Sequence, residues 1–400
     1  MALPDKVKRW AFYNFANHSY QVGYVAFLLP VFFSTLLLAK GFSLGAWGVA
    51  NGVSTVIGVT IAVVVGKYSD RHEKLVAFRW SVILTFLGMV ALACVSAIAS
   101  SVFWWMFGLF IVTNAFLIWS LALSDSILPH ISEGNETYEY GGFAWGFGYV
   151  GGIASLLLIL ALQRFTGDSS LAVFLSVPLF YAAFSCYSLT GLKNISFRES
   201  APVRPTSQLS KRHKGILFLG YWLISECITV ISLFASLYLS GEMHFLVWQV
   251  GVAFLFIQLV GFPATWLGGR LVKRYSSLKL LGWNILIWGV ALIFFLSSRR
   301  NLWELGLAIF LMGLVYGNTQ SYLRSQYATL IQKSESGFQF GIYSIVSEAA
   351  VFIGPIIYGY ASDMLHSQQI PLLTLFVFMA LGYGLIWKVM HRRTVLMEAV

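Results

Sequence analysis

The chain has 400 residues, of which 58% are hydrophobic and only 10% are charged, and its mean hydropathy is +0.76. Soluble domains carry roughly 25% charged residues, so this composition excludes a water-soluble fold and indicates a membrane protein with many spans. The net charge of +10 is spread over the connections between apolar runs and forms no single basic patch, so no nucleic-acid partner is predicted.

Twelve apolar runs follow one another along the chain. A helix needs about 20 apolar residues to cross a bilayer, because lipid offers no partner for an unpaired backbone group. The runs are apolar on all sides, which does not fit the alternating pattern of a membrane β-barrel. The sequence therefore predicts an all-α polytopic fold with spans at residues 10–38, 43–65, 76–98, 102–124, 141–162, 171–190, 215–239, 246–267, 278–297, 302–324, 338–360 and 370–390.

A polar stretch at residues 191–214 separates the runs into two sets of six. It contains two prolines, several serines and six Lys or Arg residues, a composition typical of a linker. We therefore expect an N-terminal six-helix bundle at 1–190, a basic cytoplasmic linker at 191–214, and a C-terminal six-helix bundle at 215–400.

The basic residues predict the orientation in the membrane. With the N-terminus in the cytoplasm, all of the 26 Lys and Arg residues except Lys40, Arg164, Arg299 and Arg300 fall on the cytoplasmic side. Cytoplasmic loops are enriched in Lys and Arg, so both termini are expected inside the cell. We expect a monomeric, multi-pass protein of the plasma membrane, which is the inner membrane in a bacterium.

The connection after the second span reads Gly66-Lys-Tyr-Ser-Asp70-Arg71-His-Glu-Lys74. Its glycine permits close helix approach, and its acid can meet the positive N-terminus of a neighbouring helix. It resembles the Gly-x-x-x-Asp-Arg-x-x-Arg/Lys signature of the major facilitator superfamily, and residues 269–274 resemble a degenerate second copy. The resemblance implies conformational gating by Gly66, Asp70, Arg71 and Lys74, whereas an ordinary basic loop is the alternative reading.

Three further stretches resemble one branch of that superfamily. They are Trp10-Ala-Phe-Tyr-Asn-Phe-Ala-Asn-His-Ser-Tyr20, the glycine-rich run at 141–152, and Gly317-Asn-Thr-Gln-Ser-Tyr-Leu-Arg-Ser325. They are similar to the vacuole-effluxer-like family, relatives of the yeast autophagy-related amino-acid effluxer. Asn14 stands where that family has Asp, and Glu226 lies one residue beyond the place of the family's acid in the seventh helix.

Four polar residues of the first span, from Asn14 to Gln21, recur at helical spacing and are expected on one face. Such a stripe either supplies hydrogen bonds between helices or lines a cavity, and four groups on one face favour the cavity. Because the first and seventh spans hold equivalent places in the two halves, we expect residues of the seventh to face the stripe. With the family resemblance added, the predicted substrate-binding residues are Asn14, Asn17, His18, Gln21, Glu226, Thr229 and Gln320.

Glu226 and Glu348 are the carboxylates that lie deep inside predicted spans. A buried acid either binds a proton or pairs with a cation, for which Arg324 near the cytoplasmic end of the tenth span is a candidate. We predict proton coupling by Glu226 and Glu348, with His18 as a further titrating group, and we include Arg324 among the gating residues.

Other patterns argue against enzymatic chemistry. Residues 146–151 match Gly-x-Gly-x-x-Gly but lie within an apolar helix, where close helix packing explains the glycines better than dinucleotide binding. The three cysteines lack metal-ligand spacing, and HExxH and serine-nucleophile motifs are absent from the sequence. No metal, no cofactor and no enzymatic activity are predicted.

The sequence also contains no ATP-binding P-loop motif. We therefore expect a secondary active transporter that works by alternating access on a small-molecule substrate. The resemblance implies export of an amino-acid-like metabolite, and proton coupling is an option. The alternatives are a facilitator of another small polar solute and a transporter-like receptor without flux.

Overall fold

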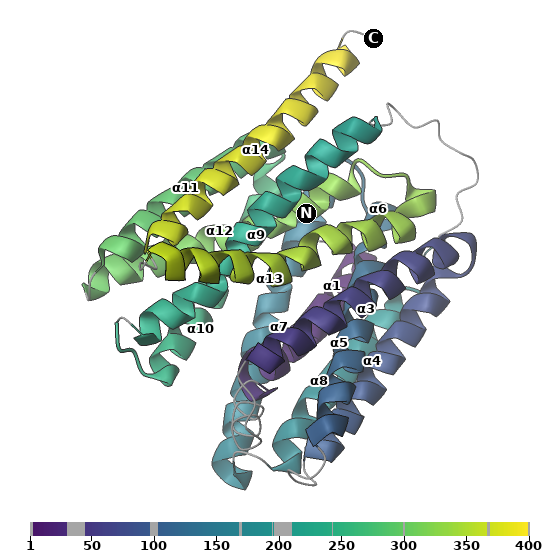
Figure 1. Cartoon of the computed structure of the whole chain (residues 1–400). Coiled ribbons are helices and arrows are strands. Elements are labelled where there is room, and N and C mark those ends of the chain that lie inside the picture. The colour runs from purple at the N-terminus through teal and green to yellow at the C-terminus, as the bar shows by residue number, and fades with distance from the viewer. Residues whose placement is uncertain are drawn as a thin grey trace. The chain divides into compact units, whose positions relative to one another are not determined.

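The computed structural model describes residues 3–29, 45–96, 103–167, 170–193, 195, 210–241, 243–298, 301–365 and 369–398. Within these ranges every regular element is a helix, as Figure 1 shows. The predicted all-α fold class is confirmed.

The helices of the first half are α1 (Asp5–His18), the π-helix η1 (Ser19–Leu28), α3 (Gly45–Arg71), α4 (Lys74–Ser96), α5 (Phe103–Asp125), α6 (Leu128–Ile131), α7 (Glu136–Thr166) and α8 (Leu171–Gly191). Those that follow are α9 (Lys211–Gly241), α10 (Val247–Leu271), α11 (Ser277–Ser297), α12 (Leu302–Ala328), the 3-10 turn η3 (Lys333–Glu335), α13 (Ser336–Leu365) and α14 (Gln369–Glu398).

Each predicted span coincides with one long helix, and α1 together with η1 forms the first. In the described part of the chain, ten helices are long and apolar enough to cross a membrane by length and composition. The other two spans are α1 with η1, whose predicted continuation at 30–38 lies outside the described residues, and α13. The structure is therefore consistent with twelve transmembrane helices.

Contacts group the helices into two units. Unit 1 comprises Met1–Ser200 and Ile331–Ser344, and unit 2 comprises Ala201–Leu330 and Ile345–Val400. The chain passes from unit 1 to unit 2 within the stretch 191–214, of which residues 194 and 196–209 lie outside the described part. It passes between the units again inside α13, because the first turns of this helix belong to unit 1 and the remainder to unit 2.

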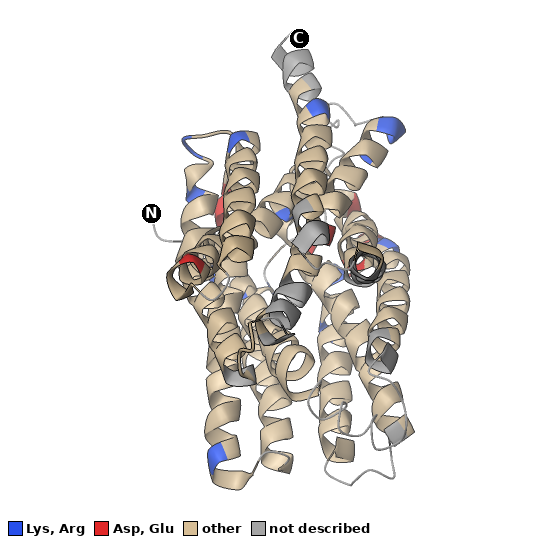
Figure 2. Ribbon diagram, turned by 60° about the vertical axis from the view of Figure 1, so that its left-hand side comes forward, with Lys and Arg blue, Asp and Glu red and all other residues tan. Residues whose placement is uncertain are grey.

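Most of the basic residues of unit 1 lie at one end. The Trp10 indole donates to the Ser124 carbonyl at 2.9 Å, and the Arg9 guanidinium lies 4.9 Å from the centre of the Tyr187 ring. These contacts bring the start of α1 together with the ends of α5 and α8. The residues at this end include Lys6, Lys8, Arg9, Lys67, Arg71, Lys74 and Lys193, and Figure 2 shows the same concentration of Lys and Arg at helix ends.

Unit 2 has a comparable end. The Tyr322 hydroxyl donates to the Gly268 carbonyl at 2.7 Å, and the Tyr221 hydroxyl donates to the Gln326 side chain at 3.1 Å. The ends of α10 and α12 therefore lie beside the start of α9. Basic side chains flank the start of α9, at 211–214, and the end of α10, at 270–274.

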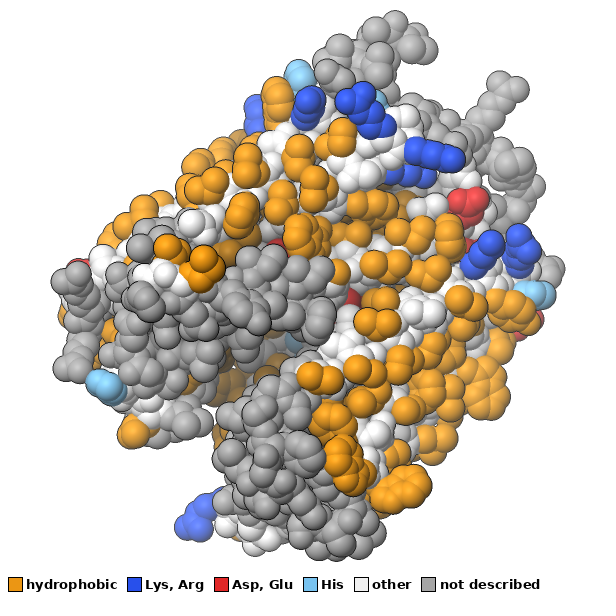
Figure 3. All heavy atoms as spheres, viewed as in Figure 1, with side chains coloured by type: hydrophobic (Ala, Val, Ile, Leu, Met, Phe, Trp, Pro, Cys, Tyr) orange, Lys and Arg blue, Asp and Glu red, His pale blue; other side chains and the backbone are white. Residues whose placement is uncertain are grey.

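The outer faces of the helices are apolar. Hydrophobic side chains cover the flanks of the described helices in Figure 3, whereas Lys and Arg lie mainly toward helix ends. Large apolar side chains are strongly exposed, among them Trp105 at 73%, Phe165 at 85% and Trp303 at 89%. Exposed apolar surface of this kind is expected where lipid is the solvent.

The glycines of α7 allow α1 to pack closely against it. A Cβ atom at Gly151 would lie 2.1 Å from the Phe15 carbonyl oxygen, and one at Gly148 would lie 2.4 Å from the His18 ring. Real side chains do not tolerate such distances, so only glycine fits these two positions. The prediction that these glycines serve helix packing is confirmed.

Candidate functional site

Three of the four predicted stripe residues lie buried on α1 in unit 1. The exposed fractions are 4% for Asn14, 1% for Asn17 and 8% for His18. The Nδ2 atom of Asn14 and the Oδ1 atom of Asn17 have no hydrogen-bond partner among the described residues. Buried polar atoms are almost always paired, so these two are available to a ligand or to water.

His18 is held at the C-terminal end of α1. Its Nδ1 atom lies 2.9 Å from the Asn14 carbonyl oxygen, one helical turn earlier, and its ring packs edge-on against Tyr149 at 5.7 Å. The close approach of Gly148 determines where the ring can lie. These contacts hold the His18 side chain in one position beside α7.

Gln21 departs from the predicted stripe and is exposed. The α-helical pattern ends at His18, and the next ten residues form the π-helix η1. The wider i→i+5 turn of a π-helix changes the angular step between residues, so the spacing of three and four no longer keeps one face. Such wide turns occur often at functional sites.

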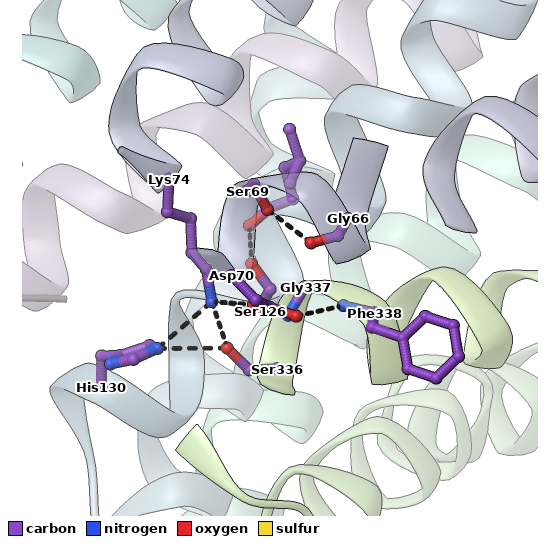
Figure 4. A network of polar contacts seen from close by, with 10 residues as sticks. Gly66, Ser69, Asp70, Lys74, Ser126, His130, Ser336, Gly337 and Phe338 are labelled. Carbon is purple, nitrogen blue, oxygen red and sulfur yellow. Dashed lines mark hydrogen bonds and ion pairs between the residues drawn. The ribbon is translucent and has the colours of Figure 1, made fainter. Parts of the chain in front are cut away.

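A second polar cluster lies at the basic end of unit 1, between the end of α3 and the start of α13 (Figure 4). The Asp70 carboxylate accepts hydrogen bonds from the backbone N–H groups of Gly337 and Phe338, both at 2.8 Å, and pairs with the Lys74 ammonium at 3.0 Å. Lys74 also donates to the Ser336 hydroxyl. We call Asp70, Lys74, Ser336, Gly337 and Phe338 the Asp70 clasp.

Two physical effects favour the clasp. The first N–H groups of a helix have no partner within it, and the helix dipole makes this end positive, so a carboxylate is the natural cap. The side chains of Asp70 and Lys74 are only 8% and 3% exposed, which strengthens their attraction. This burial sets the segment apart from an ordinary solvated loop.

Close backbone contact accompanies these bonds. A Cβ atom at Gly66 would lie 2.3 Å from the Gly337 carbonyl oxygen, and one at Gly341 would lie 2.7 Å from the Ala62 carbonyl oxygen. The predicted gating residues Gly66, Asp70 and Lys74 therefore meet at one place. Arg71 is exposed and contributes none of the hydrogen bonds of the clasp.

The connection around α6 reinforces the clasp. His130 Nε2 lies 3.1 Å from the Ser336 hydroxyl and 3.4 Å from the Lys74 ammonium. Lys333 pairs with Glu133 at 2.8 Å, and this hydrogen bond and charge lower the pKa of the Glu133 carboxyl. The sequence analysis did not identify His130, Glu133 or Lys333 as site residues, because each looks like an ordinary polar loop residue.

The remaining predicted residues belong to unit 2. Glu226 is 7% exposed, and neither of its carboxylate oxygens has a hydrogen-bond partner among the described residues. Arg324, the candidate cation for a buried acid, is buried at 2% exposure and does not bond to Glu226. An unpaired acid at this depth is unusual and marks Glu226 as a site candidate.

The other three residues of unit 2 are partly accessible. Thr229 is half-buried and donates its hydroxyl hydrogen to the Ser225 carbonyl at 3.0 Å. Gln320 and Glu348 are also half-buried, on α12 and α13. The expectation that the residues of α9 face the stripe of α1 stays a prediction.

Comparison with known proteins gives a consistent result. The profile of the family described as Major Facilitator Superfamily matches residues 22–355. An uncharacterized MFS-type transporter of Bacillus subtilis, YxiO, is 21% identical, over 93% of this chain and 92% of its own length. The family resemblance found in the sequence is confirmed by these matches.

Fungal proteins named Autophagy-related protein 22 are also similar. The one from Cryptococcus neoformans (strain B-3501A) is 23% identical over 68% of this chain, and Autophagy-related protein 22-1 of Phaeosphaeria nodorum is 28% identical over 52%. The matches span only 58% and 37% of these two fungal proteins.

Solved structures share the fold. The human organic anion transporter MFSD10 matches with a TM-score of 0.77 and 15% identity, over 96% of this chain and 100% of its own. A bacterial homologue of the iron transporter ferroportin, in an outward-facing state, matches with a TM-score of 0.72 and 15% identity, over 97% and 99%. At such low identity the likeness concerns the fold alone.

Proposed function

This chain belongs to the major facilitator superfamily, and we propose that it exports a small amino-acid-like metabolite by alternating access, coupled to proton movement. The family and fold are those of multi-pass membrane transporters, which are not enzymes. Substrate, direction and coupling form the proposal, and particular residues support the substrate and the coupling.

The observation that carries the proposal is a set of deeply buried polar atoms that have no hydrogen-bond partner among the residues that the structure describes. The set consists of Asn14 Nδ2 and Asn17 Oδ1 on α1 and both oxygens of Glu226 on α9. An amide N–H can donate to a substrate carboxylate, while an amide oxygen and a carboxylate can accept from a substrate ammonium. This combination of one donor and several acceptors suits a zwitterion, the form of an amino acid at neutral pH.

The site would be shared between the two halves. We propose that α1 and α9, the first helix of each half, contribute to one cleft near the middle of the membrane, as repeats in such transporters do. Thr229 and Gln320 are half-buried polar residues that would complete its wall. His18, held by Gly148, would shape one side of the site.

Proton coupling is assigned to Glu226. A carboxylate without a partner is costly in a dry environment, so the closed cleft favours the protonated acid and a water-filled cleft favours its release. This alternation links proton binding to the transport cycle. Glu348, half-buried on α13, and His18 are the additional titrating groups of the proposal.

Gating is assigned to the Asp70 clasp. The clasp holds the first turns of α13 against α3 and α4, while the remainder of α13 belongs to unit 2. We propose that the clasp forms in one state of the cycle and opens in another. Gly66 permits the close approach, and Arg71 and Arg324 are proposed to act in the same transition.

The proposed orientation places both termini and the 191–214 linker in the cytoplasm of the cell, with a monomer in the plasma membrane. Single cysteines introduced into that linker should be labelled only from the cytoplasmic side. Labelling from outside would contradict the proposed topology.

The function itself is tested in proteoliposomes. Purified protein should move radiolabelled members of an amino-acid panel across the membrane, and an imposed pH gradient should drive their accumulation. Flux that ignores the gradient would indicate a facilitator. No flux for any panel member, together with saturable binding, would indicate a receptor and refute the transport proposal.

A further inference from the structure

His130 lies beside the Asp70 clasp and has no role in the proposed transport cycle. Its half-buried ring comes from the short helix α6, and Nε2 contacts both Lys74 and Ser336, as Figure 4 shows. The ring also has a hydrogen bond to the backbone of Lys333. His130 thus touches both sides of the closed clasp.

These contacts fit a neutral ring. A lysine ammonium has only donors, so a hydrogen bond from Lys74 to Nε2, at 3.4 Å, needs an Nε2 atom without a proton. A proton on Nε2 would place an N–H donor against the ammonium. With Nδ1 protonated as well, the ring would carry a positive charge beside Lys74, and the Nε2 acceptor would be lost.

The surrounding charges do not compensate for a charged ring. Lys74 on α4 and Lys333 on η3 are cations that act on the ring. The acids nearby already have partners, because Asp70 on α3 binds Lys74 and the start of α13, and Glu133 binds Lys333. Lys6 adds a further positive charge that acts on Glu133.

We propose that His130 is a cytoplasmic pH sensor, whose protonation opens the Asp70 clasp and releases the first turns of α13. This proposal rests on the gating role of the clasp in the proposed function. It adds a control of transport by cytoplasmic pH that does not involve the substrate site.

The size of the effect follows from proton linkage. In the open clasp His130 is solvated and has the ordinary imidazole pKa of about 6.5, whereas the closed clasp holds the neutral ring. Lowering the pH from 7.5 to 5.5 should therefore raise the ratio of open to closed clasp about tenfold. The Glu133 carboxyl stays ionised across this interval, because its hydrogen bond and charge contact with Lys333 lower its pKa.

The test measures the clasp and not transport. Hydrogen–deuterium exchange of the full chain in lipid nanodiscs reports on the amides of Gly337 and Phe338, which are bonded to Asp70 in the closed clasp. After correction for the intrinsic exchange rate at each pH, the protection of the peptide containing them should fall about tenfold between pH 7.5 and 5.5.

Substitutions assign the response to one ring. His130→Asn, which stays neutral, should give the same protection at both pH values, and His130→Lys should give low protection at both. The matched control is His72→Asn, because His72 is an exposed histidine in the nearby connection after α3, and this variant should keep the pH response.

Constant protection in the wild type, or an unchanged response in His130→Asn, would overturn the proposal. The variant Asp70→Asn shows whether such a result means that His130 is not the sensor or that the clasp does not form at all. If Asp70→Asn loses protection at both pH values while the wild type shows no pH response, then the clasp exists and His130 does not control it.

Discussion

The packing of α1 against α7 gives a prediction whose size follows from distances. At Gly151 an added Cβ would lie 2.1, 2.7 and 2.8 Å from the carbonyl oxygen, carbonyl carbon and Cα of Phe15. These are backbone atoms that cannot rotate away, so α1 and α7 would have to separate by about 1 Å. Such overpacking costs about 1–3 kcal/mol, more than the gain of up to about 1 kcal/mol from replacing a helical glycine with alanine.

The assay compares Gly151→Ala with Gly108→Ala. Gly108 lies on the exposed face of α5 with no atom within 4 Å of an added Cβ, so its substitution should leave stability unchanged or slightly raised. Thermal unfolding followed by size-exclusion chromatography should give Gly151→Ala an apparent Tm roughly 1–5 °C below that of the control. Equal Tm values for the two variants would refute the packing argument.

Two further predictions concern the polar groups. In Asp70→Asn the amide offers only one acceptor oxygen and leaves the buried Lys74 without its acid. Protection of the Gly337 and Phe338 amides from hydrogen exchange should therefore fall by at least about tenfold. Protection equal to wild type would show that Asp70 does not hold the clasp. Asn17→Leu should abolish flux while the protein stays folded and monodisperse, because the lost amide oxygen has no hydrogen-bond partner in the described part of the chain. Aggregation of this variant would instead support a packing role.

The helices were well predicted from the sequence because hydropathy reports directly on contact with lipid. The same signal misses helical residues that are polar. The fifth span was predicted to begin at 141, but α7 begins at Glu136, and its first turns contain the polar residues Thr137 and Glu139, which are buried inside the protein. Hydropathy cannot distinguish such residues from a loop.

The polar stripe was predicted only in part, because a π-helix depends on tertiary packing more than on local residue preference. In η1 the chain is pressed against α7 and α8 at Gly23, where an added Cβ would lie 2.9 Å from Ile159. No sequence pattern in residues 19–28 predicts the wider turn of a π-helix. Gln21 therefore leaves the face that Asn14 and Asn17 share.

The clasp shows a different limit of sequence reasoning. Asp70 and Lys74 form a readable motif, and the expectation that the acid meets a helix N-terminus agrees with the structure. Its actual partners are backbone N–H groups, which carry no side-chain signature. The serine and histidine that complete the cluster are distant in sequence, so only the fold brings them to Lys74.

The central claim is that Glu226 couples transport to protons, and the most direct measurement compares counterflow with pH-driven accumulation of one substrate in proteoliposomes. Glu226→Gln keeps the size of the side chain but cannot exchange a proton, so counterflow should persist while accumulation driven by a pH gradient is lost. The control is Glu304→Gln, because Glu304 is outside the proposed site near the start of α12, where it bonds to Asn301, and this variant should behave as wild type in both assays. Full pH-driven accumulation by Glu226→Gln would contradict the account.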